Sequence, residues 1–157
     1  MRQSEAIACL REKGYKQATL VLLFAAIDQL AWVAGDKETV GNEGFKAWVQ
    51  QYMVEKNPEL LSGATAADLW GARCGVLHTG VAESNDFRKG YARRILYASN
   101  YGQVGSNDPT VLTLSLEWLG SAFAAAIVWF LSDLEADPEK DTRAREKLSR
   151  MLVDQQP

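Results

Sequence analysis

The apolar residues of the chain recur mostly at spacings of three and four, the period of an amphipathic α-helix. The clearest stripe runs through residues 17–34, and a second runs from residue 112 to residue 134. The first stripe consists of Leu20, Leu23, Phe24, Ile27, Leu30, Ala31 and Ala34. The second consists of Leu112, Leu116, Leu119, Phe123, Ile127, Phe130 and Leu134. The pattern therefore predicts two long helices.

Residues 4–13 and 43–53 carry shorter helical patterns, and we expect Gly14 to break the chain after the first of them. Three further helix starts are marked by capping residues. Thr65 and Asp68 have the form of a capping box, which predicts a helix over residues 69–78. Asp108-Pro109 and Asp137-Pro138 each pair an N-cap with a proline at the first helical position. They predict the start of the long penultimate helix and of a charged closing helix.

One segment, residues 87–108, departs from this pattern. It combines the run Ile95-Leu96-Tyr97 with later turn residues, which favours a hairpin or an irregular excursion. Together the patterns predict an all-α fold. We expect a four- to five-helix bundle with a short hairpin or loop insertion before the long penultimate helix, formed by a single domain over residues 1–157.

Composition fits a folded domain, because apolar residues make up 47% of the chain and charged residues 24%. The net charge of −3 gives no overall positive field, so any contact with nucleic acid must use a local patch. The start of the chain lacks the pattern of a signal peptide. Of the two most apolar runs, one carries Asp28 and the other is too short to span a bilayer. We therefore expect a cytoplasmic protein with no membrane contact.

The two cysteines, Cys9 and Cys74, lie far apart in the sequence, and no histidine accompanies them at metal-ligand spacing. We expect neither a metal site nor a cofactor.

The stretch "DLWGARCGVLHTG" holds the only histidine, His78, five residues after Arg73. On a straight α-helix this spacing places the two side chains about 140° apart. They would share one cleft if the helix frays or bends near Gly75, or if a second chain completes the site. From geometry alone, a structural histidine that bonds a carbonyl or favours the helix dipole is the simpler interpretation.

The stretch "RCGVLH" nevertheless has the R-x4-H form of the motif in the HEPN family of small helical bundles. The layout around it also resembles that family. An apolar helix with an acid ("FAAIDQLAW") and an aromatic helix ("FKAWVQQY") precede the motif helix, and a long helix follows. The resemblance implies a metal-independent endoribonuclease, such as those of toxin–antitoxin and defence systems. It assigns proton transfer at the ribose 2′-hydroxyl to His78 and phosphate binding to Arg73, which suits an imidazole and a guanidinium.

Cleavage by 2′-hydroxyl attack is best served by two proton carriers, and this chain has one histidine. A homodimer that brings together two copies of Arg73 and His78 would supply the second, and the family typically builds its site at such an interface. A cognate antitoxin is a further possible partner.

Two supporting residues, Asp28 and Cys74, each allow two interpretations. Asp28 interrupts an apolar helix face, so it either pairs with Arg73 or lies beside the stripe in water. Cys74 stands where many family members have a polar residue, and is either a small packing residue or a weak hydrogen-bonding group.

Basic and aromatic residues also gather in one segment. Its members are Arg88, Lys89, Tyr91, Arg93 and Arg94, with Tyr97 and Tyr101 following. Such a cluster either binds the phosphates and bases of RNA or forms a solvated loop with its tyrosines packed on the bundle. A non-catalytic helical module that binds a protein partner is the alternative to a ribonuclease, and the acidic composition favours it.

Overall fold

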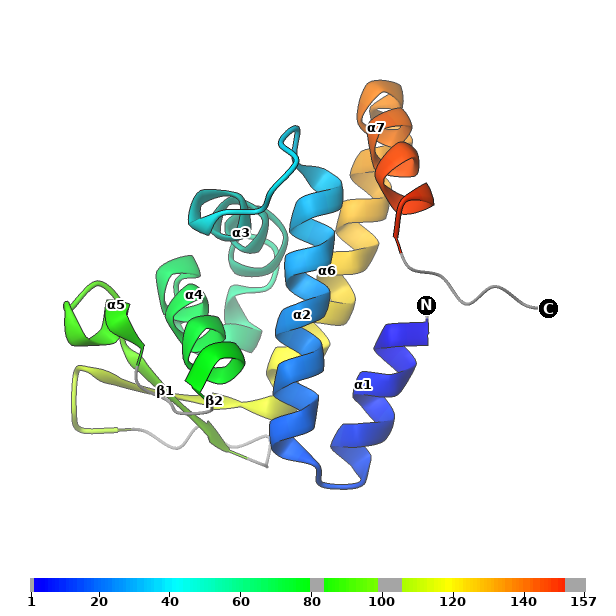
Figure 1. The fold of residues 1–157 in the computed structure, drawn as a ribbon. Coiled ribbons are helices and arrows are strands. Elements are labelled where there is room, and N and C mark those ends of the chain that lie inside the picture. The colour runs from blue at the N-terminus through cyan, green and yellow to red at the C-terminus, as the bar shows by residue number, and fades with distance from the viewer. Residues whose placement is uncertain (1, 80–83, 99–105, 152–157) are drawn as a thin grey trace.

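A computed structural model describes residues 2–79, 84–98 and 106–151, which are mostly helical (Figure 1). The elements in chain order are α1 (Arg2–Glu12), α2 (Lys16–Ala34), α3 (Asn42–Val49), the π-helical turn η1 (Gln50–Val54), the 3₁₀ turn η2 (Pro58–Leu61), α4 (Ala66–Cys74), the π-helical turn η3 (Gly75–Thr79), α5 (Asn85–Arg88), the strands β1 (Arg94–Ala98) and β2 (Val111–Ser115), α6 (Leu116–Ala136) and α7 (Pro138–Ser149).

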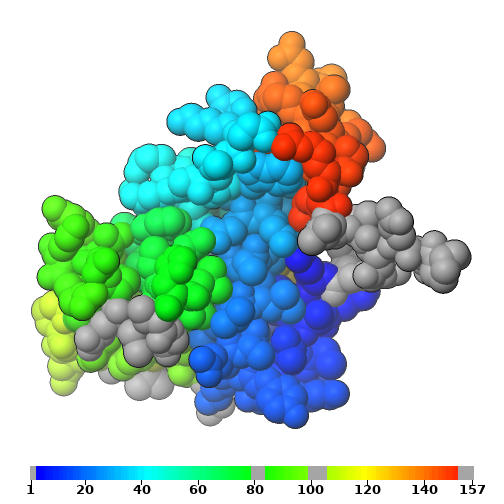
Figure 2. All heavy atoms as spheres, in the orientation of Figure 1, coloured from blue at the N-terminus to red at the C-terminus, as the bar shows by residue number. Residues whose placement is uncertain are grey.

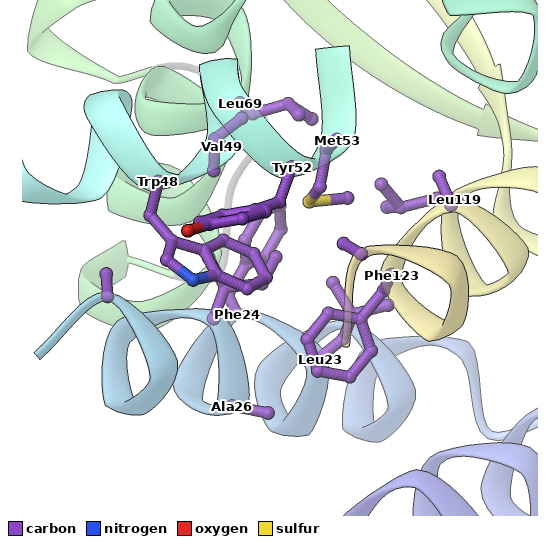
Figure 3. Close-up of a cluster of buried hydrophobic side chains, with 14 of the residues drawn as sticks. Leu23, Phe24, Ala26, Trp48, Val49, Tyr52, Met53, Leu69, Leu119 and Phe123 are labelled. Carbon is purple, nitrogen blue, oxygen red and sulfur yellow. The ribbon is translucent and has the colours of Figure 1, made fainter. Parts of the chain in front are cut away.

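Helix α2 lies at the centre of this arrangement and contacts α1, α3, α6, α7 and η3 (Figure 1). Its apolar stripe and that of α6 enter one cluster of buried side chains, in which Leu23, Phe24 and Leu119 have no exposed surface. Figure 3 shows side chains from α2, α3, η1, α4 and α6 meeting in this core. The period of three and four therefore found the core-facing sides of both long helices.

Several predicted helix boundaries are confirmed. Gly14 has φ +77°, a conformation that favours glycine, and separates α1 from α2. The Thr65 hydroxyl accepts a hydrogen bond from the Asp68 backbone N–H, and the Asp68 carboxylate accepts one from the Thr65 backbone N–H, which completes the capping box. Asp137 caps α7, whose first residue is Pro138.

Of the two alternatives for the insertion, a hairpin or a loop, the hairpin is wrong. Strands β1 and β2 pair in parallel, with Arg94 opposite Val111 and Ala98 opposite Ser115. Parallel strands need a crossover connection and cannot be joined by a tight turn. Residues 99–105 of the predicted insertion lie outside the described part of the chain.

The predicted start of the long penultimate helix is also wrong. Asp108 does not cap a helix: its carboxylate accepts hydrogen bonds from the backbone N–H and the hydroxyl of Thr110, which form a turn. The chain then extends as β2, so Leu112 belongs to a strand, and α6 begins at Leu116 with Ser115 as its N-cap. Pairing with β1 outweighs the local preference of the Asp-Pro signal for a helix.

Two helices, α2 and α6, have the length and the mean hydropathy, 1.5 and 1.4, of membrane-spanning segments. This finding concerns length and composition alone, and the core helix of a folded protein meets the same criteria. The cytoplasmic location and the absence of membrane contact therefore stay predictions.

The end of α2 is held by a lysine from the closing helix. The Lys147 ammonium group donates to the backbone carbonyls of Trp32 (2.7 Å), Gly35 (2.6 Å) and Lys37 (2.9 Å). Lys147 is buried, and a cation at the C-terminal end of a helix also favours its dipole. This contact fixes α7 against α2.

We expect Lys147→Met to lower the free energy of unfolding by about 2 kcal/mol, because three partly buried hydrogen bonds to the end of α2 are lost together. Urea denaturation followed by tryptophan fluorescence measures the loss. Lys140→Met removes a more exposed lysine of the same helix and should change stability by less than about 0.5 kcal/mol. Equal effects of the two substitutions would contradict this role of Lys147.

Candidate active site at the junction of α4 and η3

Helix α4 carries the candidate site at its C-terminal end and is anchored at its N-terminal end by an ion pair. The Asp68 carboxylate is buried and accepts from the Arg93 side chain at 2.6 Å and from the Arg93 backbone N–H at 2.7 Å. Arg93 also donates to the carbonyl of Gly63 (2.7 Å). Gly71 adds a close approach, since a Cβ there would lie 3.0 Å from that of Ala92. The start of α4 is thereby fixed to the segment that leads into β1.

Arg73 and His78 are in contact because the helix changes its winding between them. Helix α4 ends at Cys74 and continues as the π-helical turn η3, in which hydrogen bonds join residues five apart. In a π-helical turn, the residue five positions along the chain lies about one helical turn away. In an α-helix that place is taken by the residue four positions along. The Nη1 atom of Arg73 is 2.9 Å from the Nε2 atom of His78. The 140° separation expected on a straight helix is therefore removed at Gly75.

Asp28 of α2 holds the other edge of the Arg73 guanidinium. Its Oδ2 atom accepts from Nε of Arg73 at 3.0 Å and from Nη2 at 2.6 Å. The side chains of Asp28 and Arg73 are 22% and 18% exposed, so the pair is partly shielded from water. Of the two alternatives for Asp28, the structure has the one in which it pairs with Arg73.

This environment keeps the guanidinium charged and the neighbouring thiol neutral. Burial opposes the charge of Arg73, but hydrogen bonding and charge from Asp28 outweigh it and raise the Arg73 pKa. Burial raises the pKa of the Cys74 thiol, although Arg73 acts in the opposite direction. Cys74 is half-buried beside the guanidinium as a neutral thiol. Its contribution to a reaction stays a prediction.

Trp70 supports Arg73 from one turn earlier in α4. The Cζ atom of Arg73 lies 5.1 Å from the centre of the Trp70 ring, within the range of a cation–π contact. Trp70 in turn packs edge-on against the buried Phe45 of α3, with 5.4 Å between ring centres. The spacing of three residues between Trp70 and Arg73 is the signal that could have identified this pair.

The basic and aromatic segment lies beside α4 and runs from the end of α5 through residues 89–93 to the start of β1 (Figure 2). Arg88, Lys89 and Tyr91 are exposed, and Tyr91 is the most exposed large hydrophobic side chain described, at 72%. Arg93 forms an ion pair with Asp68, and the Cζ atom of Arg94 lies 5.9 Å from the centre of the Phe87 ring. Tyr97 is partly buried and packs against the hydrophobic core, where burial raises the pKa of its hydroxyl, whereas Tyr91 does not pack on the fold. Tyr101 lies outside the described residues.

Among the residues that the structure describes, no group of three or more His, Cys, Asp or Glu side chains could hold a metal ion. Comparisons of the chain with protein-family models, with curated proteins and with solved structures find no match. The function must therefore be argued from the site itself.

The Asp68–Arg93 pair makes a pH-dependent contribution to stability. Burial alone would raise the pKa of Asp68, but hydrogen bonds from Arg93 and Thr65 hold it below the usual value of 3.8. The ionised carboxylate therefore stabilises the fold above this value, and the contribution disappears as the pH falls through the lower pKa of the folded state.

We expect Asp68→Asn to lower the free energy of unfolding by about 2 kcal/mol at neutral pH, since Arg93 loses its charged partner. The difference from the wild type should shrink as the pH falls below the usual value of 3.8, because only the wild type loses this stabilisation on protonation. Denaturation curves at several pH values measure it. Asp36→Asn, at an exposed position, is the control for the charge. A difference that stayed constant over this range would contradict the assignment.

We expect Asp28→Asn to destabilise the fold by about 1–2 kcal/mol, because a neutral amide cannot compensate the charge of the partly buried Arg73. Asp36→Asn serves again as the matched control, with an expected change below about 0.5 kcal/mol. Urea denaturation separates the two. If Asp28→Asn were as stable as Asp36→Asn, the ion pair would not contribute to holding α4 against α2.

Proposed function

We propose that this protein is a metal-independent endoribonuclease of the HEPN type, which cleaves RNA by attack of a ribose 2′-hydroxyl on the adjacent phosphate. The observation that carries the proposal is the 2.9 Å contact between Arg73 and His78, held in place by Asp28. It joins a phosphate-binding guanidinium to the only side chain whose ordinary pKa lies near neutrality. The R-x4-H form of the sequence around them supports the same assignment.

The contact defines which nitrogen of His78 can take a proton. An arginine only donates hydrogen bonds, so in this contact Nε2 of His78 accepts, as it does in the neutral tautomer that carries its proton on Nδ1. A neutral imidazole is the form that a general base requires. His78 is exposed, so an RNA strand can reach it.

The nitrogens of the Arg73 guanidinium face two different partners. Its Nε and Nη2 atoms face Asp28, while Nη1 faces His78. The Nη1 side is therefore directed toward the place where a scissile phosphate beside His78 would lie. A phosphate oxygen that binds there replaces His78 as the acceptor and frees Nε2 for the 2′-hydroxyl proton. Arg73 would then stabilise the charge that develops on the phosphate oxygens.

The proposed reaction uses two histidines, one to accept a proton and one to donate a proton. The neutral imidazole of one His78 takes the 2′-hydroxyl proton as the 2′-oxygen bonds to phosphorus. The bond from phosphorus to the 5′-oxygen breaks, and a protonated imidazole donates to that oxygen. The products are a 2′,3′-cyclic phosphate and a 5′-hydroxyl. Because each chain has one histidine, a homodimer with its two motif helices face to face is part of the proposal. A toxin or defence setting with an antitoxin partner belongs to the same hypothesis.

A second candidate function is that of a non-catalytic module that binds a protein. One observation favours it: Val128 and Leu131 of α6 are 65% and 52% exposed and lie on one side of that helix. Neighbouring exposed apolar side chains are typical of a surface that a partner covers.

We expect the wild type to cleave a mixed RNA pool in EDTA and to leave 2′,3′-cyclic phosphate ends, and His78→Ala to be slower by at least about 100-fold. Electrophoresis and mass spectrometry of the ends measure both. Arg73→Ala should also be inactive, and circular dichroism checks that each variant is folded. Arg143→Ala, an exposed arginine of α7, should retain activity. Folded, dimeric wild type that leaves RNA intact would refute the ribonuclease and favour the binding module.

A further inference from the structure

A hollow of about 580 Å³ lies at the end of α4 opposite to Arg73, between the start of that helix, α5 and the turn that precedes β2. Its wall includes Thr65, Phe87, Arg88, Tyr91, Arg93 and Thr110. This volume is within the range of sites that bind small organic groups. The hollow therefore has the size and the side chains to receive a ligand.

Tyr91 forms an exposed but well-positioned aromatic surface at this hollow. Gly90 has φ +75°, a left-handed conformation that turns the chain out of α5. The backbone N–H of Tyr91 then donates to the carbonyl of Asp86 at 2.8 Å, which fixes the backbone while the side chain is 72% exposed. An exposed aromatic ring on a fixed backbone has few side-chain torsions to order when a base stacks on it.

The charge of the hollow is carried by Arg88. Asp68 and Arg93 also line it, but they neutralise each other in their ion pair. Arg88 is exposed, and its Nη2 atom donates to the side chain of Asn85, on the same short helix. The Thr65 and Thr110 hydroxyls are hydrogen-bonded to Asp68 and Asp108, so the groups left for a ligand are the guanidinium and the aromatic face. A guanidinium beside an aromatic face matches a nucleotide, which presents a phosphate and a flat base.

We propose that this hollow binds one unpaired nucleotide of the RNA substrate, with its base stacked on Tyr91 and its phosphate bound by Arg88. Thr65 and Arg73 are eight residues apart along the helix, which corresponds to about 12 Å at about 1.5 Å per residue. The hollow and a phosphate bound at Arg73 thus lie at separate positions along α4. The hollow therefore takes a nucleotide farther along the strand and selects single-stranded RNA, whose bases are free to stack.

This inference rests on the proposed ribonuclease function, and its first test measures binding without cleavage. Fluorescence anisotropy gives the affinity of folded His78→Ala protein for a labelled single-stranded RNA of mixed sequence. In that background we expect Tyr91→Ala to weaken binding about tenfold, and Arg88→Gln to lower the dependence of log affinity on log salt by about one. Tyr15→Ala and Arg143→Gln, at exposed positions on other elements, should have little effect.

The second test uses substrate length. We expect a dinucleotide bound at Arg73 and His78 to leave the hollow empty, and a longer oligonucleotide to occupy both places. In an otherwise wild-type protein, Tyr91→Ala should therefore lower kcat/KM about tenfold for the longer RNA and leave the dinucleotide unchanged. Equal losses on both substrates would overturn the distal site, because Tyr91 would then act on the reacting nucleotides or on the fold.

The remaining outcomes separate the two proposals. If His78→Ala protein binds RNA but Tyr91→Ala and Arg88→Gln behave like their controls, the nucleotide site is wrong and the ribonuclease stands. If neither wild type nor His78→Ala protein binds RNA, both proposals fail. A nucleoside monophosphate that binds as tightly as the oligonucleotide, and displaces it completely, would show that the hollow serves a free nucleotide instead of the strand.

Discussion

The ion pair between Arg73 and Asp28 joins the last turn of α4 to the middle of α2, and the candidate site depends on it. Both side chains are largely shielded, so neither charge can be left alone without a substantial loss of stability. The pair fixes two of the three guanidinium nitrogens and thereby the direction of the third, which faces His78. The same contact thus secures a helix and orients a reactive group.

A second ion pair, between Asp68 and Arg93, holds the opposite end of α4. Its buried carboxylate caps the helix and also binds the backbone that leads into β1. Helix α4 is therefore attached at one end to the central helix and at the other to the strands. The two candidate binding places, one at Arg73 and one at the hollow beside Tyr91, occupy these two ends and are kept at a fixed separation by a short rigid helix.

Local signals predicted much of this fold. The spacing of the apolar residues predicted α2 and the body of α6, and capping residues predicted the starts of α4 and α7. Both signals depend only on residues a few positions apart in the chain. The parallel strands escaped prediction because Ile95 pairs with Leu112 across a long connection, and no local pattern reveals the direction of such a pairing. That same pairing converted Leu112 from an expected helical residue into a strand residue.

The sequence by itself determined the mostly helical class, the helix that carries Arg73 and His78, and the candidate partner Asp28. These follow from short-range periodicity and from the chemistry of a few side chains. Only the tertiary structure decided that Arg73 meets both His78 and Asp28, that Arg93 serves Asp68, and that Tyr91 remains exposed. Such choices depend on a local change of helical winding and on which segments pack against α4, and packing is settled by the whole chain at once.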